Sequence, residues 1–255
     1  MKISAVLRSA ISKVRKGENN AANSRRRNDR FNDHSRWTHH SDVSQRNYQS
    51  YEQYVEHQSS KLDNIVDQLE RRHARDFQDF RCRFETCAPL REARNVLCLG
   101  ARLGPEVQAL LDLGYFAVGI DLNPGPKNAY VLHGDFHKLV FANDSVDAVY
   151  TNVLDHVFDL EKLLSEVKRV LRPEGLFIAD LVYGTDEGTI AGDYEAFWWH
   201  DSKAMIDQLA VMGNFNLVES RELPQFRKGR WRQGVMRKPL NLATSVVQEA
   251  ISSSC

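Results

Sequence analysis

The stretch NVLCLGARLG, residues Asn95–Gly104, followed by Gly119-Ile120-Asp121, decides the fold of this chain. It predicts a buried strand, a glycine turn, a helix, a second strand and an acidic residue at the end of that strand. In doubly wound α/β sheets, glycines let the backbone approach a ligand, and such an acid accepts hydrogen bonds from ribose hydroxyls. The pattern therefore predicts a nucleotide-type site at the carboxyl edge of a sheet.

The spacing of the glycines narrows the ligand class. A dinucleotide fingerprint needs G-x-G-x-x-G, whereas Gly100 and Gly104 are four residues apart with Arg102 between them. A nicotinamide-dependent oxidoreductase is therefore disfavoured.

Apolar segments alternate between strand and helix patterns from residue 93 to residue 182. Two further segments, 214–220 and 230–237, read as a hairpin that closes the sheet. We expect an α/β fold with a doubly wound, mostly parallel seven-stranded sheet. The expected strands are 96–99, 117–120, 130–133, 146–151, 175–181, 214–220 and 230–237, and the expected helices in this region are 105–113, 160–171 and 202–212.

The segments outside this region differ in composition. Residues 1–30 contain nine Lys or Arg and two acidic residues, although the 255-residue chain has a net charge of zero. We expect a basic, flexible arm over 1–47, a helical extension of one or two helices over 48–92, the α/β domain over 93–240 and a flexible tail over 241–255. Apolar residues at helical spacing in 1–16 predict a basic amphipathic helix. It contacts an anionic membrane surface, contacts a partner or acts in targeting, or has no role.

Cysteine and hydropathy patterns bear on the compartment. The four cysteines show no paired-ligand spacing, so neither a disulfide framework nor a zinc site is expected. The sequence also lacks an apolar run of membrane-spanning length and a secretory signal pattern. We expect a cytoplasmic protein, with peripheral membrane contact through residues 1–16 as an alternative.

Five motifs occur in an order that resembles the class I S-adenosylmethionine-dependent methyltransferases. The resemblance covers roughly residues 93–240 and implies the Rossmann-like methyltransferase fold with S-adenosyl-L-methionine as cofactor. The motifs are Val96–Gly104, Gly119–Asp121, His133–Phe136, Ser145–Val157 and Val170–Phe177.

The resemblance also implies cofactor-binding positions. Asp121 falls on the residue that binds the ribose, and Asp135 on the residue that meets the adenine amine. The chain departs from the family pattern at Cys98, where an acid is usual, and at Arg102, where glycine is usual; a forked guanidinium there suits the cofactor carboxylate. The implied cofactor residues are Leu99, Gly100, Ala101, Arg102, Gly104, Asp121, Leu122, Gly134, Asp135, Phe136, Asn152 and Val153.

The candidate catalytic and acceptor-binding residues are predicted from their positions relative to the expected strands. Asp155 and His156 follow the fourth expected strand, 146–151, and are the candidate bases for a hydroxyl acceptor. Trp198, Trp199 and His200 lie where the family contacts its substrate, and we expect them to contact the acceptor. No metal site is expected.

These residues lead to one function and an alternative. We expect methyl transfer to a small-molecule or glycan acceptor at oxygen. The amine-methylating motif of nucleic-acid enzymes is missing, because the corresponding residues are Thr151–Leu154, so nucleic acid is not an expected partner. The alternative is a non-catalytic scaffold that keeps the fold, and the sequence leaves the oligomeric state open.

Overall fold

A mostly parallel seven-stranded sheet forms the centre of the molecule. The computed structural model describes residues 37–224 and 229–240. Within them the strand order is β5-β4-β3-β6-β7-β10-β9, with β10 antiparallel to β7 and to β9. The predicted sheet is confirmed. Its strands are β3 (Asn95–Leu99), β4 (Phe116–Asp121), β5 (Val131–His133), β6 (Val146–Thr151), β7 (Leu171–Val182), β9 (Asn216–Leu223) and β10 (Trp231–Arg237).

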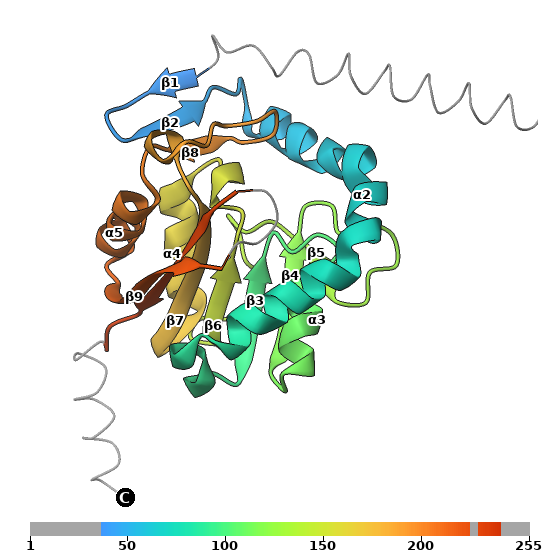
Figure 1. Ribbon diagram of the computed structural model, residues 1–255, viewed down its shortest axis with the longest axis vertical. Helices are drawn as coiled ribbons and strands as arrows, with labels where there is room; N and C mark the ends of the chain where they lie inside the picture. The colour runs from blue at the N-terminus through green and yellow to red at the C-terminus, as the bar shows by residue number, and fades with distance from the viewer. Residues whose placement is uncertain (1–36, 225–228, 241–255) are drawn as a thin grey trace, which may run out of the picture.

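Helices cover both faces of this sheet (Figure 1). On one face, α3 (Pro105–Asp112) packs with the carboxyl-terminal half of α2 (Tyr51–Glu85). On the other, α4 (Leu160–Val170) and α5 (Ser202–Gly213) bury their apolar sides. The two hydrophobic cores therefore lie on opposite sides of the sheet, as expected for a three-layer α/β fold.

Local sequence explains where the helices begin. Pro105 occupies the first turn of α3, where its missing N–H costs no hydrogen bond. The Asp159 carboxylate caps α4 by accepting from the Lys162 N–H at 2.9 Å, and Asp201 caps α5 by accepting from the Ala204 N–H at 2.7 Å. Short 3-10 turns connect other elements: η2 (Ala88–Glu92), η3 (Leu154–His156) and η4 (Thr185–Glu187).

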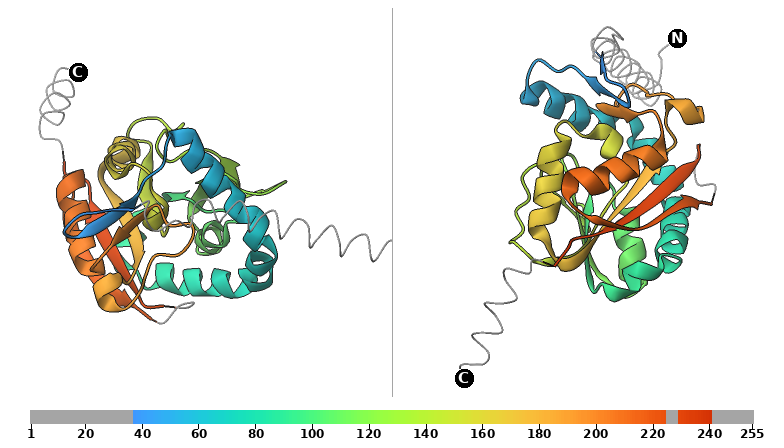
Figure 2. Two further views of the ribbon diagram at one scale, coloured as in Figure 1. Left: turned by 90° about the horizontal axis from the view of Figure 1, so that it is seen from above. Right: turned by 90° about the vertical axis from the view of Figure 1, so that its left-hand side faces the viewer.

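The helical extension is a single helix, α2, that begins over the carboxyl edge of the sheet. Figures 1 and 2 show that it crosses this edge, changes direction and runs down one face beside α3. The Ser50 hydroxyl caps it by accepting from the Gln53 N–H at 3.3 Å. The first half of α2 therefore lies above the predicted ligand site.

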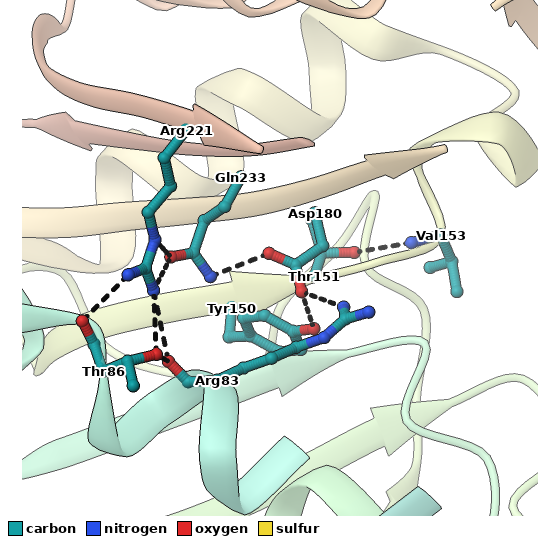
Figure 3. Close-up of polar contacts among 8 residues, drawn as sticks. All are labelled: Arg83, Thr86, Tyr150, Thr151, Val153, Asp180, Arg221 and Gln233. Carbon is teal, nitrogen blue, oxygen red and sulfur yellow. Dashed lines mark hydrogen bonds and ion pairs between the residues drawn. The ribbon is translucent and has the colours of Figure 1, made fainter. Parts of the chain in front are cut away.

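A buried polar network fastens the second half of α2 to the sheet (Figure 3). The Arg83 guanidinium donates to the Asp180 carboxylate on β7 at 2.6 Å, and the Tyr150 hydroxyl on β6 donates to the same oxygen at 2.8 Å. The Gln233 amide on β10 donates to the other oxygen at 2.9 Å. Gln233 in turn accepts from Arg221 on β9, so the network joins five elements.

A small three-stranded sheet corrects the predicted extent of the flexible arm. Residues 37–47 were expected to be flexible, yet β1 (Trp37–His39) pairs with β2 (Val43–Arg46), and β2 pairs with β8 (Phe197–Trp199). At the end of β2, Arg46 is buried and donates to the Glu195 carbonyl oxygen at 2.7 Å, which ties β2 to the segment before β8. This sheet lies over the carboxyl edge (Figure 1).

Some predictions fall outside the described residues. The amphipathic helix of residues 1–16, the rest of the arm to residue 36, and the tail 241–255 are among them. Within residues 37–224 and 229–240, every helix is too short or too polar to cross a membrane.

Candidate functional site

The candidate site lies at the carboxyl ends of β3, β4 and β6. The chain winds from β3 to β4 and β5 on one side and then returns to β6 on the other, so a crevice opens between β3 and β6. A cavity of about 240 Å³ occupies this place beneath α2. A smaller pocket adjoins it, and both are lined by Gly100, Arg102, Val153 and His156.

The glycine turn after β3 forms one wall. Gly100 has a φ of +71°, and a Cβ atom there would lie 2.3 Å from Val153 Cγ2. Its N–H donates to the Ile120 carbonyl at 2.8 Å, which ties the turn to β4. Arg102 also has a positive φ, and its Nη1 atom is buried without a hydrogen-bond partner among the described residues. A buried guanidinium nitrogen that lacks a partner suits an anionic ligand group.

Asp121 ends β4 inside the smaller pocket and is 6% exposed. One carboxylate oxygen accepts from the Asn123 N–H at 2.8 Å, and the other accepts from the Arg102 N–H at 3.1 Å. These bonds fix its orientation while leaving lone pairs for further donors. The geometry is compatible with the predicted contact to ribose hydroxyls.

Asp135 follows β5 and contacts the first turn of α2. The Tyr51 hydroxyl donates to one of its oxygens at 2.5 Å, and the His137 N–H donates to the other at 2.8 Å. Burial alone raises the pKa of the Asp135 carboxyl, but the hydrogen bonds from His137 and Tyr51 outweigh it and lower that pKa to about 2. Asp135 is therefore an anion that joins α2 to the edge of the site.

His156 lies in η3 with both ring nitrogens engaged. Nδ1 donates to the Tyr194 carbonyl at 2.9 Å, since a carbonyl only accepts. Nε2 is then the acceptor, and it accepts a hydrogen bond from the Lys61 ammonium at 2.7 Å. Burial and the Lys61 charge hold the pKa of His156 well below its ordinary value. The imidazole is neutral, and its basic nitrogen already has a donor.

Asp155 is beside His156 and faces the main cavity. Burial, and next the charge of Glu195, raise the pKa of the Asp155 carboxyl to about 7. Burial, and next the charge of Arg102, lower the pKa of Lys61 to about 8. The site thus holds a carboxyl group and an amine that both change protonation close to neutral pH.

Asp155, His156 and Glu195 also offer ligand atoms that all lie within 4.8 Å of one another. The Lys61 ammonium contacts the histidine nitrogen of this group and supplies the positive charge. We therefore assign no metal to it.

Side chains from α2 line the site, and the sequence analysis missed them. Residues 54, 58, 61, 65, 69, 72 and 76 line the two pockets at steps of three and four along the helix. This is the period of one helix face. A lysine at position 61, on the same face as Ile65 and Leu69, was the available signal, because an ammonium on an apolar face requires a polar partner in the fold. Glu195 gave no such signal.

The predicted cofactor residues gather at this edge. Five line the main cavity and three more line the smaller pocket, while the other four line neither. The main cavity is lined by Gly100, Ala101, Arg102, Asn152 and Val153, and the smaller pocket also by Asp121, Leu122 and Phe136. The remaining four are Leu99, Gly104, Gly134 and Asp135.

The aromatic residues expected to contact the acceptor lie elsewhere. Trp199 is 1% exposed, belongs to the hydrophobic core and donates to the Val182 carbonyl at 2.8 Å, so its role is packing. Trp198 and His200 line a different cavity together with Trp37. The Trp198 and Trp199 rings stack on each other with their centroids 5.6 Å apart, and neither lines the cavity beside the glycine turn. The structure therefore does not bring these three residues to the cavity beside the glycine turn, and their contact with the acceptor stays a prediction.

Comparison with known proteins identifies the domain type. Residues 97–179 match the family model described as a methyltransferase domain. No curated protein matches the chain.

Solved structures share the fold. The 1,6-didemethyltoxoflavin-N1-methyltransferase of Burkholderia thailandensis, with bound 1,6-didemethyltoxoflavin and S-adenosylhomocysteine, superposes with a TM-score of 0.62 at 15% identity, over 80% of this chain and 99% of that one. A SAM-dependent methyltransferase from Methanosarcina mazei superposes with a TM-score of 0.50 at 20% identity, over 60% of this chain and 96% of that one.

Proposed function

We propose that this chain, whose methyltransferase domain matches over residues 97–179, is a class I S-adenosylmethionine-dependent methyltransferase that methylates a hydroxyl group of a small-molecule or glycan acceptor. The observation that carries the proposal is Asp155. It is a carboxyl group that faces the cavity and titrates close to neutral pH, beside the glycine turn of the cofactor motif.

The residues of the carboxyl edge fit the cofactor. S-adenosylmethionine supplies an electrophilic methyl group when it is bound. We assign its carboxylate to the buried Arg102 Nη1 atom, its ribose hydroxyls to Asp121 and its adenine edge to the segment 134–136. Gly100 lines both pockets, so no side chain at this position separates the backbone from the assigned cofactor.

Asp155 is the proposed base. A hydroxyl acceptor loses its proton as it takes the methyl group, and a base with a pKa near the working pH removes it most effectively. His156 is less suited, because Nδ1 donates to a backbone carbonyl and Nε2 accepts from Lys61. We propose that His156 positions the neighbouring groups. The protein mainly supplies proximity and alignment, which contribute about 7–11 kcal/mol in well-oriented reactions.

A screen with a matched variant tests the function. The full chain, S-adenosylmethionine and a panel of sugars, phenols and amines are incubated, and S-adenosylhomocysteine release is measured. We expect release with hydroxyl acceptors and a loss of about 10²–10⁴-fold in kcat for Asp155→Asn. Asp112→Asn, on the surface of α3, is the control. Release with amines alone would contradict oxygen as the methylated atom, and cofactor binding without any turnover would favour a scaffold.

A further inference from the structure

Lys61 places a primary amine inside the proposed methyl-transfer cavity. It comes from the middle of α2 and lines the same cavity as Gly100, Ala101 and Arg102 of the cofactor turn. Because α2 is held at Asp135 by Tyr51 and at Asp180 by Arg83, the position of the amine is fixed by the fold. Nζ is therefore a built-in nucleophile next to the proposed cofactor site.

The surroundings of Nζ favour the reactive form of the amine. An ammonium ion has no lone pair and must lose a proton before it attacks carbon. Burial and the positive charge of Arg102 both lower the pKa of Lys61, so the neutral amine forms more readily than at an exposed lysine. Lys203 on α5, by contrast, is exposed and pairs with the Asp207 carboxylate at 2.9 Å.

Proton acceptors and an aromatic face complete the surroundings. His156 Nε2 already accepts from Nζ at 2.7 Å, and the Asp155 carboxylate lies next to that ring. On another side, Nζ lies 5.4 Å from the centroid of the Tyr194 ring. An aromatic ring at this distance stabilises an ammonium ion, including a methylated one, by a cation–π interaction.

We propose that Lys61 is a self-methylation site, at which the protein transfers a methyl group from S-adenosylmethionine to its own Nζ atom. The proposal rests on the proposed function, because it uses the same cofactor site. It adds a covalent modification of α2 to the transfer to a free acceptor.

The step balances in atoms and charge. The Nζ lone pair forms the N–CH₃ bond, the S–CH₃ bond breaks, and its electron pair stays on sulfur, so that the sulfonium leaves as neutral S-adenosylhomocysteine. The proton that Nζ lost passes through His156 Nε2 or the Asp155 carboxylate to solvent. Repetition at Nζ removes N–H donors, and a trimethylated Lys61 no longer donates to His156. The modification would thus release the basic nitrogen of His156.

Mass spectrometry of the full chain tests the proposal. Purified protein is incubated with S-adenosylmethionine that carries a deuterated methyl group, digested with chymotrypsin and mapped. We expect the label on the peptide that contains Lys61, at a rate per molecule that does not change on dilution, and none on the peptide of Lys203. Lys61→Arg keeps a positive charge and should lose the label.

A second readout does not depend on turnover. Without cofactor, acetylation of each lysine by acetic anhydride is followed over a pH series. We expect Lys61 to reach half-maximal reactivity at a lower pH than Lys203, and S-adenosylhomocysteine to protect Lys61 alone.

Calorimetry distinguishes failure of this proposal from failure of the proposed function. If the protein binds S-adenosylmethionine and Lys61 gains no label, self-methylation is overturned while the proposed function stands. If the protein does not bind the cofactor, both are overturned. Label that appears on Lys203 as fast as on Lys61 would also overturn the assignment, because it would show unselective methylation.

Discussion

Asp121 is the single side chain on which the proposed cofactor assignment depends most. Its two oxygens accept from backbone N–H groups and are held in the smaller pocket. An ionised acceptor makes a stronger hydrogen bond than a neutral one. Its position at the end of β4 could be predicted from the sequence, since the end of a strand is a local property of the chain, while its role in binding stays a prediction.

Asp121→Asn is expected to weaken cofactor binding. The amide keeps the size of the side chain but loses the charge, and a hydrogen bond to a charged group contributes about 1.5–3 kcal/mol, or roughly 10–150-fold in affinity. Isothermal titration with S-adenosylmethionine measures it, and Asp112→Asn should bind as the wild type does. Unchanged affinity in Asp121→Asn would place the ribose elsewhere.

Asp155 links activity to pH at the residue scale. Since its pKa is raised to about 7, methylation of a hydroxyl acceptor should increase as the pH rises through neutrality. The pH dependence of kcat measures this increase. Asp155→Asn should remove it together with most of the activity. A rate in the wild type that is flat from pH 6 to 8 would exclude Asp155 as the base.

Asp155 should also make the stability of the fold depend on pH, and stability should fall over the pH range in which activity rises. A carboxyl group whose pKa is higher in the folded than in the unfolded chain favours folding while it is protonated, and this contribution is lost as the pH rises from about 4 to about 7. Asp155→Asn should therefore raise the urea midpoint at pH 8 and leave it nearly unchanged at pH 4. A lower midpoint at pH 8 would contradict the assigned burial of an ionised carboxylate.

At the scale of elements, α2 both lines the candidate site and is fastened to the sheet by the buried network around Arg83. The sequence pattern indicates that the pocket-lining residues share one helix face. It does not indicate what this face packs against, because no local signal shows that the helix crosses the carboxyl edge of the sheet. The network of Arg83, Asp180 and Gln233 joins residues about 50 to 150 positions apart in the chain. Such pairs follow from topology and not from local pattern.

Asp180→Ala should destabilise the fold through this anchor. Removing one partner of a buried ion pair leaves the Arg83 guanidinium uncompensated, which costs about 3–5 kcal/mol. Urea unfolding followed by circular dichroism measures the loss. Asp207→Ala, which breaks the exposed pair with Lys203, should change stability by about 0.5 kcal/mol or less. Similar values for the two variants would contradict the anchoring role.

At the scale of the whole molecule, the α/β domain could be predicted well from the sequence, whereas the elements that lie over its carboxyl edge could not. Periodicity and glycine turns located all seven strands, because each is a local signal. The three-stranded sheet was missed, since β2 pairs with β8 across about 150 residues and the polar composition around it resembles a linker. That sheet and α2 together enclose the edge at which the ligand site lies (Figure 1).

Calorimetric titration of the purified chain with S-adenosylmethionine, with NAD as the control ligand, tests the central claim most directly. The claim is that the crevice beside Gly100 and Asp121, enclosed by α2, is a methyl-donor site. We predict micromolar binding of S-adenosylmethionine, no binding of NAD, and weakened binding in Asp121→Asn. Absence of binding in a folded wild-type protein, or equal binding of NAD, would contradict it.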